Sequence, residues 1–303
     1  MLGSVPDAED AVQDALLRAW RGLPGFAGNS SLRSWLYRIA TNVCLRMIER
    51  RPKLVLPIDY GPPSDPHGAR EGPALDSLWI DPLSTGAGAD GLATPEARYE
   101  QRESVELAFI AALQHLPARQ RAVLLLRDVL GFSPSEIATA LDVTPTAVYS
   151  LLARAHETVE RRLPERSQQA TLGSLTDERL RDLVERYVRA WEEADVPGIV
   201  GLLTEDATFS MPPRPSWYQG RAAIGAFLAW GPVDRPDRWR HVTTRANGQL
   251  AFGVYESHDA GEIYLPHAIE VLALNDDAQI VDVVAFHQAE AFTRFGLPAQ
   301  IDR

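Results

Sequence analysis

The feature that most constrains the fold is a pair of helix starts that lie eleven residues apart. The segment SPSE, which begins at Ser133, is a capping box with proline at the first helical position, and Thr144 is again followed by proline. A helix that begins after Ser133 must therefore end before Thr144. The sequence predicts two short helices, over 134–141 and 145–162, that meet across a tight turn.

Two helices in this arrangement are typical of a helix-turn-helix, whose second helix lies in the major groove of DNA. An ordinary pair of packed helices in a bundle has the same spacing. Spacing alone therefore leaves DNA binding and plain packing open for this segment.

Helical periodicity fills most of the first 165 residues, and strand-like segments fill the last third. Amphipathic stretches cover 8–20 and 32–51, a segment rich in proline and glycine follows from 52 to 95, and helical periodicity resumes near Tyr99. After a helix that starts near Thr176, strand-like segments are expected at 205–211, 239–246, 249–257, 263–274 and 279–287. The sequence thus predicts a multidomain protein in which all-α blocks precede an α+β part.

Charge is distributed unevenly along the chain. The 303 residues include 30 basic and 41 acidic side chains, a net charge of −11, which argues against a protein that coats nucleic acid through bulk electrostatics. Between Arg33 and Lys53, however, six basic residues accompany one acid, a local net charge of +5. Residues 59–106 hold ten acids and three arginines, a net charge of −7. The acidic total therefore conceals a basic surface.

Several classes of protein are excluded by what the chain lacks. Cys44 is the only cysteine, which excludes an internal disulfide and a cysteine-rich zinc site. No run approaches the roughly 20 apolar residues that a membrane span needs, and the segment MLGSVPDAED lacks the pattern of a signal peptide. We expect a cytoplasmic protein with no membrane contact, no metal and no cofactor.

The helix expected at 32–51 combines charge with aromatic groups. Arg33, Arg38 and Arg46 accompany Trp35 and Tyr37, a mixture that holds a nucleic-acid strand by phosphate contact and base stacking. The apolar spacing of the helix also places Trp35 in a core, which we favour for this residue. A solvated face would explain the arginines equally well, but we expect them to contact DNA.

Two long motifs resemble a known family. DAEDAVQDALLRAWRGLPGF, followed by SLRSWLYRIATNVCLRMIERR, resembles region two of extracytoplasmic-function (ECF) sigma factors, and LPARQRAVLLLRDVLGFSPSEIATALDVTPTAVYSLLARA resembles their region four. The resemblance implies a protein that binds promoter DNA and core RNA polymerase, the latter through the β′ clamp and the β flap. It also implies that region two is incomplete at its N-terminus, because family members carry a further helix before DAED.

The same resemblance assigns functional residues by position. Polymerase contacts fall on Asp10, Gln13 and Asp14 of the first helix. Contacts to the minus-ten promoter element fall on the loop and helix that follow, at Phe26, Asn29, Ser31, Arg33, Tyr37, Arg38, Thr41, Asn42 and Arg46. Contacts to the minus-thirty-five element fall on the second helix of the helix-turn-helix, at Thr146, Tyr149, Ser150 and Arg154.

The C-terminal third resembles a SnoaL-like domain of the nuclear-transport-factor type, in the segments YVRAWEEADVPGIVGLLTEDATFSMPP, WYQGRAAIGAFL and IVDVVAFHQAEAFTRFGLP. Such a cone wraps a curved antiparallel sheet around a pocket, whose expected lining here is Phe209, Met211, Trp217, Tyr218, Trp230, His267 and His287. Aromatic residues at such places also serve as plain core, and no acid–base pair is identifiable by spacing, so we expect no catalytic residues. We expect the domain to tune promoter engagement, with a small molecule as its ligand.

These resemblances predict four parts: an incomplete region two at 1–54, an acidic linker at 55–98, the region-four helix-turn-helix at 99–168 and the SnoaL-like domain at 175–303. The predicted function is promoter-specific transcription initiation without enzymatic activity, regulated by the C-terminal domain. One alternative is a one-component regulator that senses a ligand and binds DNA through its helix-turn-helix without polymerase. The other is a cyclase or isomerase activity of the SnoaL-like domain.

Overall fold

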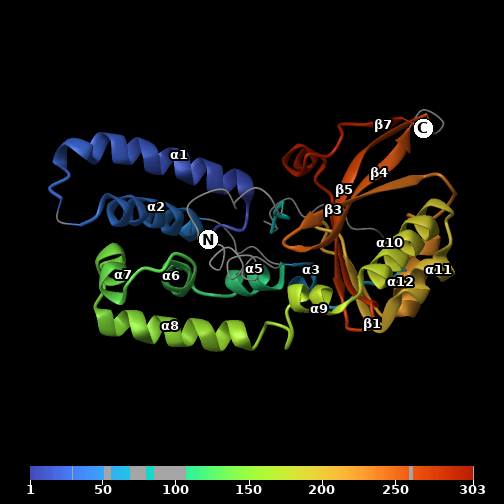
Figure 1. Ribbon diagram of the computed structural model, residues 1–303, viewed down its shortest axis with the longest axis horizontal. Helices are drawn as coiled ribbons and strands as arrows, with labels where there is room; N and C mark the ends of the chain where they lie inside the picture. Colours follow the sequence, from blue (N-terminus) through green and yellow to red (C-terminus); the bar gives the residue numbers. More distant parts are fainter. Residues whose placement is uncertain (29, 51–55, 69–79, 85–106, 259–261, 303) are drawn as a thin grey trace. The chain divides into compact units, whose positions relative to one another are not determined.

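The computed structural model describes residues 1–303 except 29, 51–55, 69–79, 85–106, 259–261 and 303. The described residues form two compact units (Figure 1). The first, here called the helical unit, draws on Met1–Val55, Asp76–Asp81 and Leu107–Pro164. The second, here called the cone, draws on Leu56–Leu75, Pro82–Glu106 and Glu165–Arg303. The predicted division into four parts is finer than these two units and stays a prediction.

The helical unit begins with two neighbouring helices, α1 (Val5–Gly22) and α2 (Leu32–Glu49), joined through a 3-10 turn, η1 (Leu23–Gly25). Small side chains allow the helices to approach closely, because Ala11 and Ala15 of α1 pack against Val43 of α2. The predicted bounds of both helices are reproduced within two or three residues, since glycine and proline follow the first and a serine cap precedes the second.

The remaining helices of this unit are α5 (Leu107–Gln114), α6 (Ala118–Leu124), a π turn η2 (Leu125–Val129), α7 (Pro134–Leu141) and α8 (Pro145–Glu160). The predicted capping box is present, because the side chains and amides of Ser133 and Glu136 bond each other reciprocally. Thr144 accepts a hydrogen bond from the Ala147 amide and so caps α8. Asp142 ends α7 with a φ of 54°, in the left-handed region that turns the chain sharply. The two helix caps and the sharp turn between the helices therefore produce the predicted helix-turn-helix.

A buried arginine joins the segments around α6. Arg121 is 5% exposed, and its guanidinium donates to the Gln114 side chain at 2.7 Å and to the carbonyls of Gln114 and Leu116. A further bond runs to the Met1 carbonyl at 2.6 Å. Burial lowers the pKa of Arg121 to about 10, so the side chain remains a cation that several oxygens must solvate.

The cone is built on a single sheet within the described residues. Its strand order is β2-β1-β6-β5-β4-β3, and β7 pairs with β5. The strands are β1 (Leu203–Ser210), β2 (Trp217–Gln219), β3 (Trp239–Ala246), β4 (Gln249–His258), β5 (Ile263–Leu274), β6 (Ile280–Phe286) and β7 (Ile301–Asp302). The helical elements are α3 (Pro57–Tyr60), α9 (Gln168–Ser174), α10 (Asp177–Glu192), α11 (Val196–Gly201), α12 (Arg221–Trp230) and a 3-10 turn η4 (Ala289–Phe295).

The sheet is mixed, which corrects the expectation of an antiparallel one. Strand β1 runs parallel to β6, whereas β3, β4, β5 and β6 pair antiparallel in succession. A parallel pair needs a long crossover connection, and here α12 and the strands β2 to β5 lie between β1 and β6 in the sequence. The strand-like segments were visible in the sequence, but their relative directions were not.

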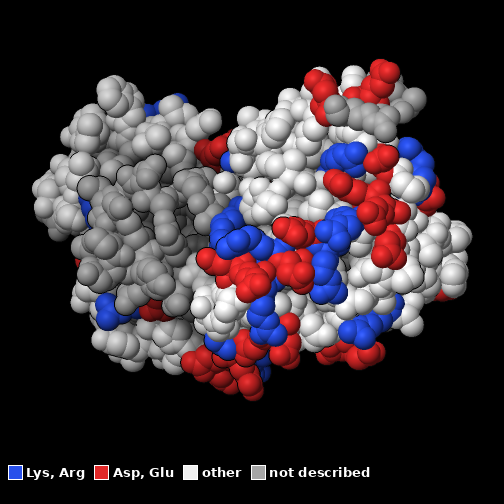
Figure 2. All heavy atoms as spheres, turned by 45° about the vertical axis from the view of Figure 1, so that its right-hand side comes forward, with Lys and Arg blue, Asp and Glu red and all other residues white. Residues whose placement is uncertain are grey.

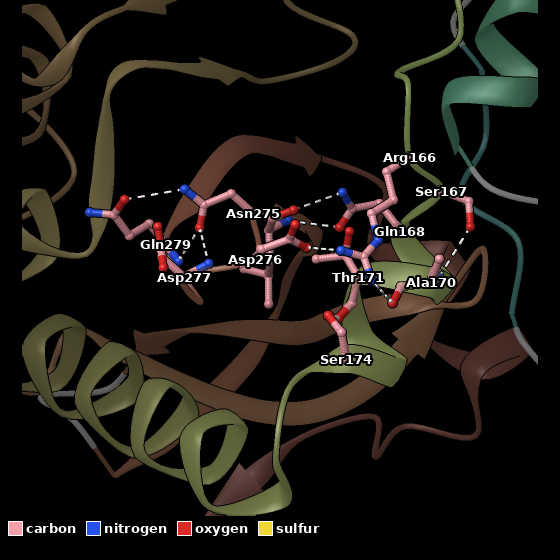
Figure 3. Close-up of polar contacts among 11 residues, drawn as sticks. Arg166, Ser167, Gln168, Ala170, Thr171, Ser174, Asn275, Asp276, Asp277 and Gln279 are labelled. Atoms are coloured by element: carbon pink, nitrogen blue, oxygen red, sulfur yellow. Dashed lines mark hydrogen bonds and ion pairs between the residues drawn. The ribbon is translucent and has the colours of Figure 1, made fainter.

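Helix α9 is anchored to the cone by side-chain bonds (Figure 3). The buried Gln168 amide donates to the Leu274 carbonyl at 2.9 Å and accepts from the Leu274 amide at 2.7 Å, as a neighbouring strand would. Arg166 forms an ion pair with Asp276 at 2.6 Å and donates to the Ala170 carbonyl. These bonds fix the chain to the end of β5 only a few residues after α8 ends.

Candidate nucleic-acid interface and the cavity of the cone

The exposed face of α8 carries the four side chains expected to read the minus-thirty-five element. Thr146, Tyr149, Ser150 and Arg154 are all exposed, and Tyr149 is 60% exposed. Their spacing of three, four and eight residues places them on one side of the helix. Val148, Ala155 and Val159 face the core on the other side. This face presents hydroxyl groups, a phenol and a guanidinium, which are groups that bind base edges and phosphates.

The side chains expected to bind the minus-ten element are divided by the fold. Arg38 and Arg46 are exposed, and Asn42 is half-buried. Thr41, by contrast, is 4% exposed, so its hydroxyl does not reach solvent in this structure. Asn29 lies outside the described residues. The exposed part of α2 is therefore basic, with Arg38 and Arg46 two turns apart.

The N-terminal half of α2 packs against the helix-turn-helix. The Arg33 guanidinium donates to the Leu130 carbonyl at 2.6 Å and lies 4.6 Å from the centroid of the Phe132 ring. Tyr37 contacts the same Phe132 ring edge-on, at 5.3 Å between centroids. Two side chains predicted to bind promoter DNA therefore contact region four in the free chain. This contact was not predicted by the spacing of residues in either helix.

A hydroxyl and a carboxylate extend this contact. Ser34 donates to Glu136 Oε1 at 3.0 Å and lies 2.8 Å from the Ser31 hydroxyl. Hydrogen bonds from the amide and hydroxyl of Ser133, with a further one from Ser34, hold the pKa of Glu136 below its usual range. Glu136, which belongs to the capping box of α7, thus also binds α2, so Ser31 and Ser34 are held beside the start of α7.

The loop between α1 and α2 turns its aromatic side chain onto α2. Phe26 is half-buried, and its ring lies 5.0 Å from that of Trp35. A Cβ atom at Gly22 would approach the Trp35 ring to 3.3 Å, so this ring also covers the end of α1. The preference for packing over direct base stacking at Trp35 agrees with these contacts.

The three residues expected to bind polymerase share the exposed side of α1. Asp10 and Gln13 are exposed, and Asp14 is half-buried. Asp14 accepts a hydrogen bond from Arg18 Nε at 2.8 Å, and this bond lowers the pKa of Asp14. The exposed side of α1 therefore presents the Asp10 carboxylate and the Gln13 amide to solvent, beside the Asp14 carboxylate that is paired with Arg18.

An apolar groove lies beside these residues. In the amphipathic stretch at 8–20, Val12, Leu16 and Trp20 recur at the spacing of one helical face, but they are exposed, Trp20 to 78%. Leu16, Leu17 and Trp20, together with side chains of α2, line a groove of about 670 Å³ that also includes Gln13. In α1 the buried side chains are all alanines, because the contact with α2 covers only a narrow strip of this helix. An exposed apolar surface of this kind marks an interaction site.

The cone contains a partly open cavity of about 60 Å³, which is lined by residues of its sheet and of α10 and α12. Among the residues expected in the pocket, Phe209, Met211, His267 and His287 line the cavity. The other three lie elsewhere. Trp217 donates to the Gly61 carbonyl, Tyr218 stacks on Phe227 at 4.2 Å, and Trp230 is 53% exposed.

Two of the cavity's polar residues were missed by the sequence analysis. Glu270 is 2% exposed and accepts a hydrogen bond from the Tyr187 hydroxyl at 2.8 Å. Burial and the nearby Glu270 carboxylate raise the pKa of Tyr187 well above its usual range, so Tyr187 stays a donor. The His241 ring lies near this pair, with Nε2 3.7 Å from Glu270 Oε2. The two residues are 29 positions apart in the sequence, on β3 and β5.

Two further histidines line another part of the cavity. The rings of His267 and His287 lie 4.6 Å apart, and His267 Nδ1 lies 3.3 Å from Glu256 Oε2. Burial lowers the pKa of His267, and burial together with His267 and Arg214 lowers that of His287 to about 3. Both rings are therefore neutral at pH 7.

Comparison with known proteins identifies the family. A model of Sigma-70 region 2 matches residues 1–53, a model of Sigma-70 region 4 matches 106–158, and a model of a SnoaL-like domain matches 184–283. The ECF RNA polymerase sigma factor SigG of Mycobacterium tuberculosis is 43% identical over 300 residues, which make up 98% of this chain and 79% of SigG. The chain belongs to the ECF RNA polymerase sigma factors.

Other sigma factors match over smaller parts or with lower identity. The ECF RNA polymerase sigma-E factor of Escherichia coli K12 is 29% identical over 160 residues, 52% of this chain and 74% of sigma-E. The crystal structure of the M. tuberculosis ECF sigma factor SigJ has a TM-score of 0.57 and 21% identity, covering 98% of this chain and 93% of SigJ. The predicted fold, helical sigma regions followed by a SnoaL-like α+β domain, is confirmed.

As an ECF sigma factor, the chain acts in promoter-specific transcription initiation with RNA polymerase, which confirms this part of the predicted function. A one-component regulator would use region four alone and leave the match to region two unexplained. No helix in the described part of this sigma factor is long and apolar enough to cross a membrane.

Surface charges of both signs lie close together on the cone of the sigma factor. Figure 2 shows acidic and basic side chains interspersed on one face of the molecule. In the cone, Arg238 forms ion pairs with Asp234 at 2.9 Å and with Glu256 at 2.8 Å, and Arg221 pairs with Glu205 at 2.7 Å. Interspersed charge of this kind gives little long-range attraction to DNA.

Proposed function

We propose that this sigma factor reads the minus-thirty-five element with Thr146, Tyr149, Ser150 and Arg154 of α8. The observation that supports this most strongly is that all four side chains are exposed on one face of a helix-turn-helix. The second helix of such a motif enters the major groove, where hydroxyl and guanidinium groups bind base edges and phosphates.

The minus-ten element is bound by the loop before α2 and by the basic face of α2. Phe26, Asn29 and Ser31 belong to this loop, while Arg33, Tyr37, Arg38, Thr41, Asn42 and Arg46 follow along the helix. The exposed guanidinium groups of Arg38 and Arg46 support phosphate contact along a single strand. Arg33 and Tyr37 become available to DNA when α2 leaves α7.

Core RNA polymerase is the protein partner. The β′ clamp binds α1 through Asp10, Gln13 and Asp14, and the β flap binds region four. The exposed apolar groove beside Gln13 supports a protein contact on this side of α1. Since the polymerase of bacteria is cytoplasmic, we place the sigma factor in the cytoplasm.

The cone regulates promoter engagement and performs no reaction. Helix α9 is bonded to β5 through Gln168 and follows α8 closely in the chain, which supports a mechanical connection between the cone and the promoter-reading helix. The cavity supports regulation by a small-molecule ligand.

Run-off transcription with purified core polymerase tests this function. We expect Arg154→Ala to reduce initiation from the cognate promoter about tenfold or more, because a side-chain contact to a base or phosphate contributes about 1–3 kcal/mol. Arg186→Ala is the matched control, since Arg186 is an exposed arginine of the cone that pairs with Asp182 in the helix turn before it. Equal transcription by both variants would contradict the assignment of α8, and no promoter-specific transcript from the wild-type chain would contradict the function itself.

A further inference from the structure

The cavity of the cone contains a histidine whose ring nitrogens have no hydrogen-bond partner among the described residues. The His241 side chain is 0% exposed, and neither Nδ1 nor Nε2 is bonded. Its ring is packed against Trp191 at 5.4 Å and Phe252 at 5.8 Å between centroids. An imidazole always carries at least one N–H group, and leaving a buried polar group unpaired costs about 1–3 kcal/mol. A partner from outside the chain would remove this cost.

Glu270 provides a second polar group at the same place. Its carboxylate accepts one hydrogen bond from Tyr187, and a carboxylate has about four acceptor positions. The His241 Nε2 atom is 3.7 Å away, which is too far for a hydrogen bond. Glu270 therefore keeps unused acceptor positions, and both residues line the same cavity. A group that donates to Glu270 would also lie within reach of His241.

The walls of the cavity select against anions and favour flat rings. Trp191, Phe209, Phe227 and Trp239 contribute aromatic surface, and neither lysine nor arginine is among the residues that line the cavity. Since His267 and His287 are neutral at pH 7, no cationic group of the lining would offset a bound anion. The volume of about 60 Å³ has room for about two water molecules, at about 30 Å³ each, or for one small ring.

We propose that the cavity binds a small, flat, uncharged molecule that carries one O–H or N–H group, with this group donating to Glu270 beside His241. This inference deepens the regulatory part of the proposed function by naming the chemical class of the ligand. The apolar walls hold the ring, and the two polar residues fix its orientation. A ligand bound there contacts β5, the strand whose end at Leu274 holds α9.

Calorimetric titration of the full chain with small probes tests the chemical class. Phenol and the smaller pyrazole carry a ring and a donor, toluene lacks the donor, and benzoate carries a negative charge. We expect phenol or pyrazole to bind at least tenfold more tightly than toluene and benzoate. Absence of binding by both donor rings overturns the proposal, and so does equal or tighter binding of toluene or benzoate.

Two variants test the residues. His241→Phe keeps an aromatic ring in the cavity and removes the unpaired nitrogens, so we expect probe affinity to fall about tenfold while the melting temperature stays equal or rises. Glu270→Gln replaces an acceptor oxygen with a donor NH₂ group, and we expect a similar loss. Arg186→Ala, which lies outside the cavity, serves as the control. Unchanged probe affinity in both cavity variants overturns the proposal, as does a crystal structure at saturating phenol that shows only ordered water there.

Because these titrations contain neither polymerase nor DNA, their outcome is independent of the sigma function. Run-off transcription can succeed while the probes fail to bind, which would overturn the ligand class alone. Conversely, binding of the probes by a chain that initiates no transcription would contradict the sigma function and leave the ligand class in place.

Discussion

Asp282 of β6 is a carboxyl group of the cone whose pKa is raised to about 6. Its Oδ1 atom accepts a hydrogen bond from the Thr208 hydroxyl of the neighbouring strand β1. Burial of the carboxyl group raises the pKa of Asp282 to about 6, although hydrogen bonds from Thr208 and from the Val283 amide act in the opposite direction. The folded cone therefore binds this proton at a higher pH than the unfolded chain does.

We expect the free energy of unfolding of the cone to decrease as the pH rises from about 4 to about 6. Between these values the folded state holds a proton that the unfolded state has lost, so raising the pH favours unfolding. A difference of about two pKa units corresponds to about 3 kcal/mol, which solvent screening of this half-buried residue reduces to about 1–3 kcal/mol.

Asp282→Asn removes the titration and keeps the shape of the side chain. Urea denaturation of both proteins, followed by tryptophan fluorescence at a series of pH values, measures the effect. The difference in unfolding free energy between them should change by about 1–3 kcal/mol over this interval. A difference that is constant with pH would show that Asp282 titrates normally.

His241 and Glu270 show why the cavity was only partly predictable. Their positions follow from the registers of two strand pairs, in which His241 lies opposite Val254 and Phe252 lies opposite Glu270. A shift of one residue in either register would turn one of them to the other face of the sheet. Phe209 and His267 were identified because aromatic residues and histidine stand out in a strand. Glu270 was not identified, because a glutamate in a strand usually faces solvent.

At the scale of elements, helices with strong local signals were predicted well. Ser133 and Thr144 fix the starts of α7 and α8 through backbone hydrogen bonds that involve only neighbouring residues. The apolar face of α1 was misjudged for the opposite reason. Its periodicity shows that Leu16 and Trp20 lie on an apolar side of the helix, but only the tertiary structure shows which part of that side α2 covers.

The contact between α2 and α7 leads to a prediction about the free sigma factor. Ser34 donates to Glu136, and neither residue is among those expected to bind DNA. We expect Ser34→Ala to increase the affinity of the free chain for a single-stranded minus-ten oligonucleotide about two- to tenfold. One hydrogen bond contributes about 0.5–1.5 kcal/mol to the closed contact, and DNA must displace that contact to reach Arg33 and Tyr37.

Fluorescence anisotropy with a labelled oligonucleotide measures this affinity, and hydrogen exchange of the α2 amides reports whether the helix opens more often. Ser135→Ala is the matched control, because Ser135 is exposed at the start of the same helix α7. If Ser34→Ala and Ser135→Ala bind the oligonucleotide equally, the contact does not compete with DNA.

At the scale of the whole molecule, charge is arranged so that the free chain has little attraction for DNA. The net charge is −11, yet residues 33–53 carry a net charge of +5, and residues 59–106 carry −7. Most of this acidic segment lies outside the described residues, so its role is a prediction from the sequence alone. An acidic segment tethered near a basic helix raises the local concentration of carboxylates that compete with phosphate groups.

We therefore expect neutralisation of the ten acids in 59–106, by Asp→Asn and Glu→Gln, to tighten binding of the free chain to DNA several-fold at low salt. The gain should vanish at about 1 M salt, where charges more than about 3 Å apart are screened. The matched control neutralises ten exposed acids within residues 165–303 and so changes the net charge equally. If both variants gain the same affinity, bulk charge explains the effect. A larger gain for the 59–106 variant, measured by anisotropy across a salt series, is the result that local shielding of α2 requires.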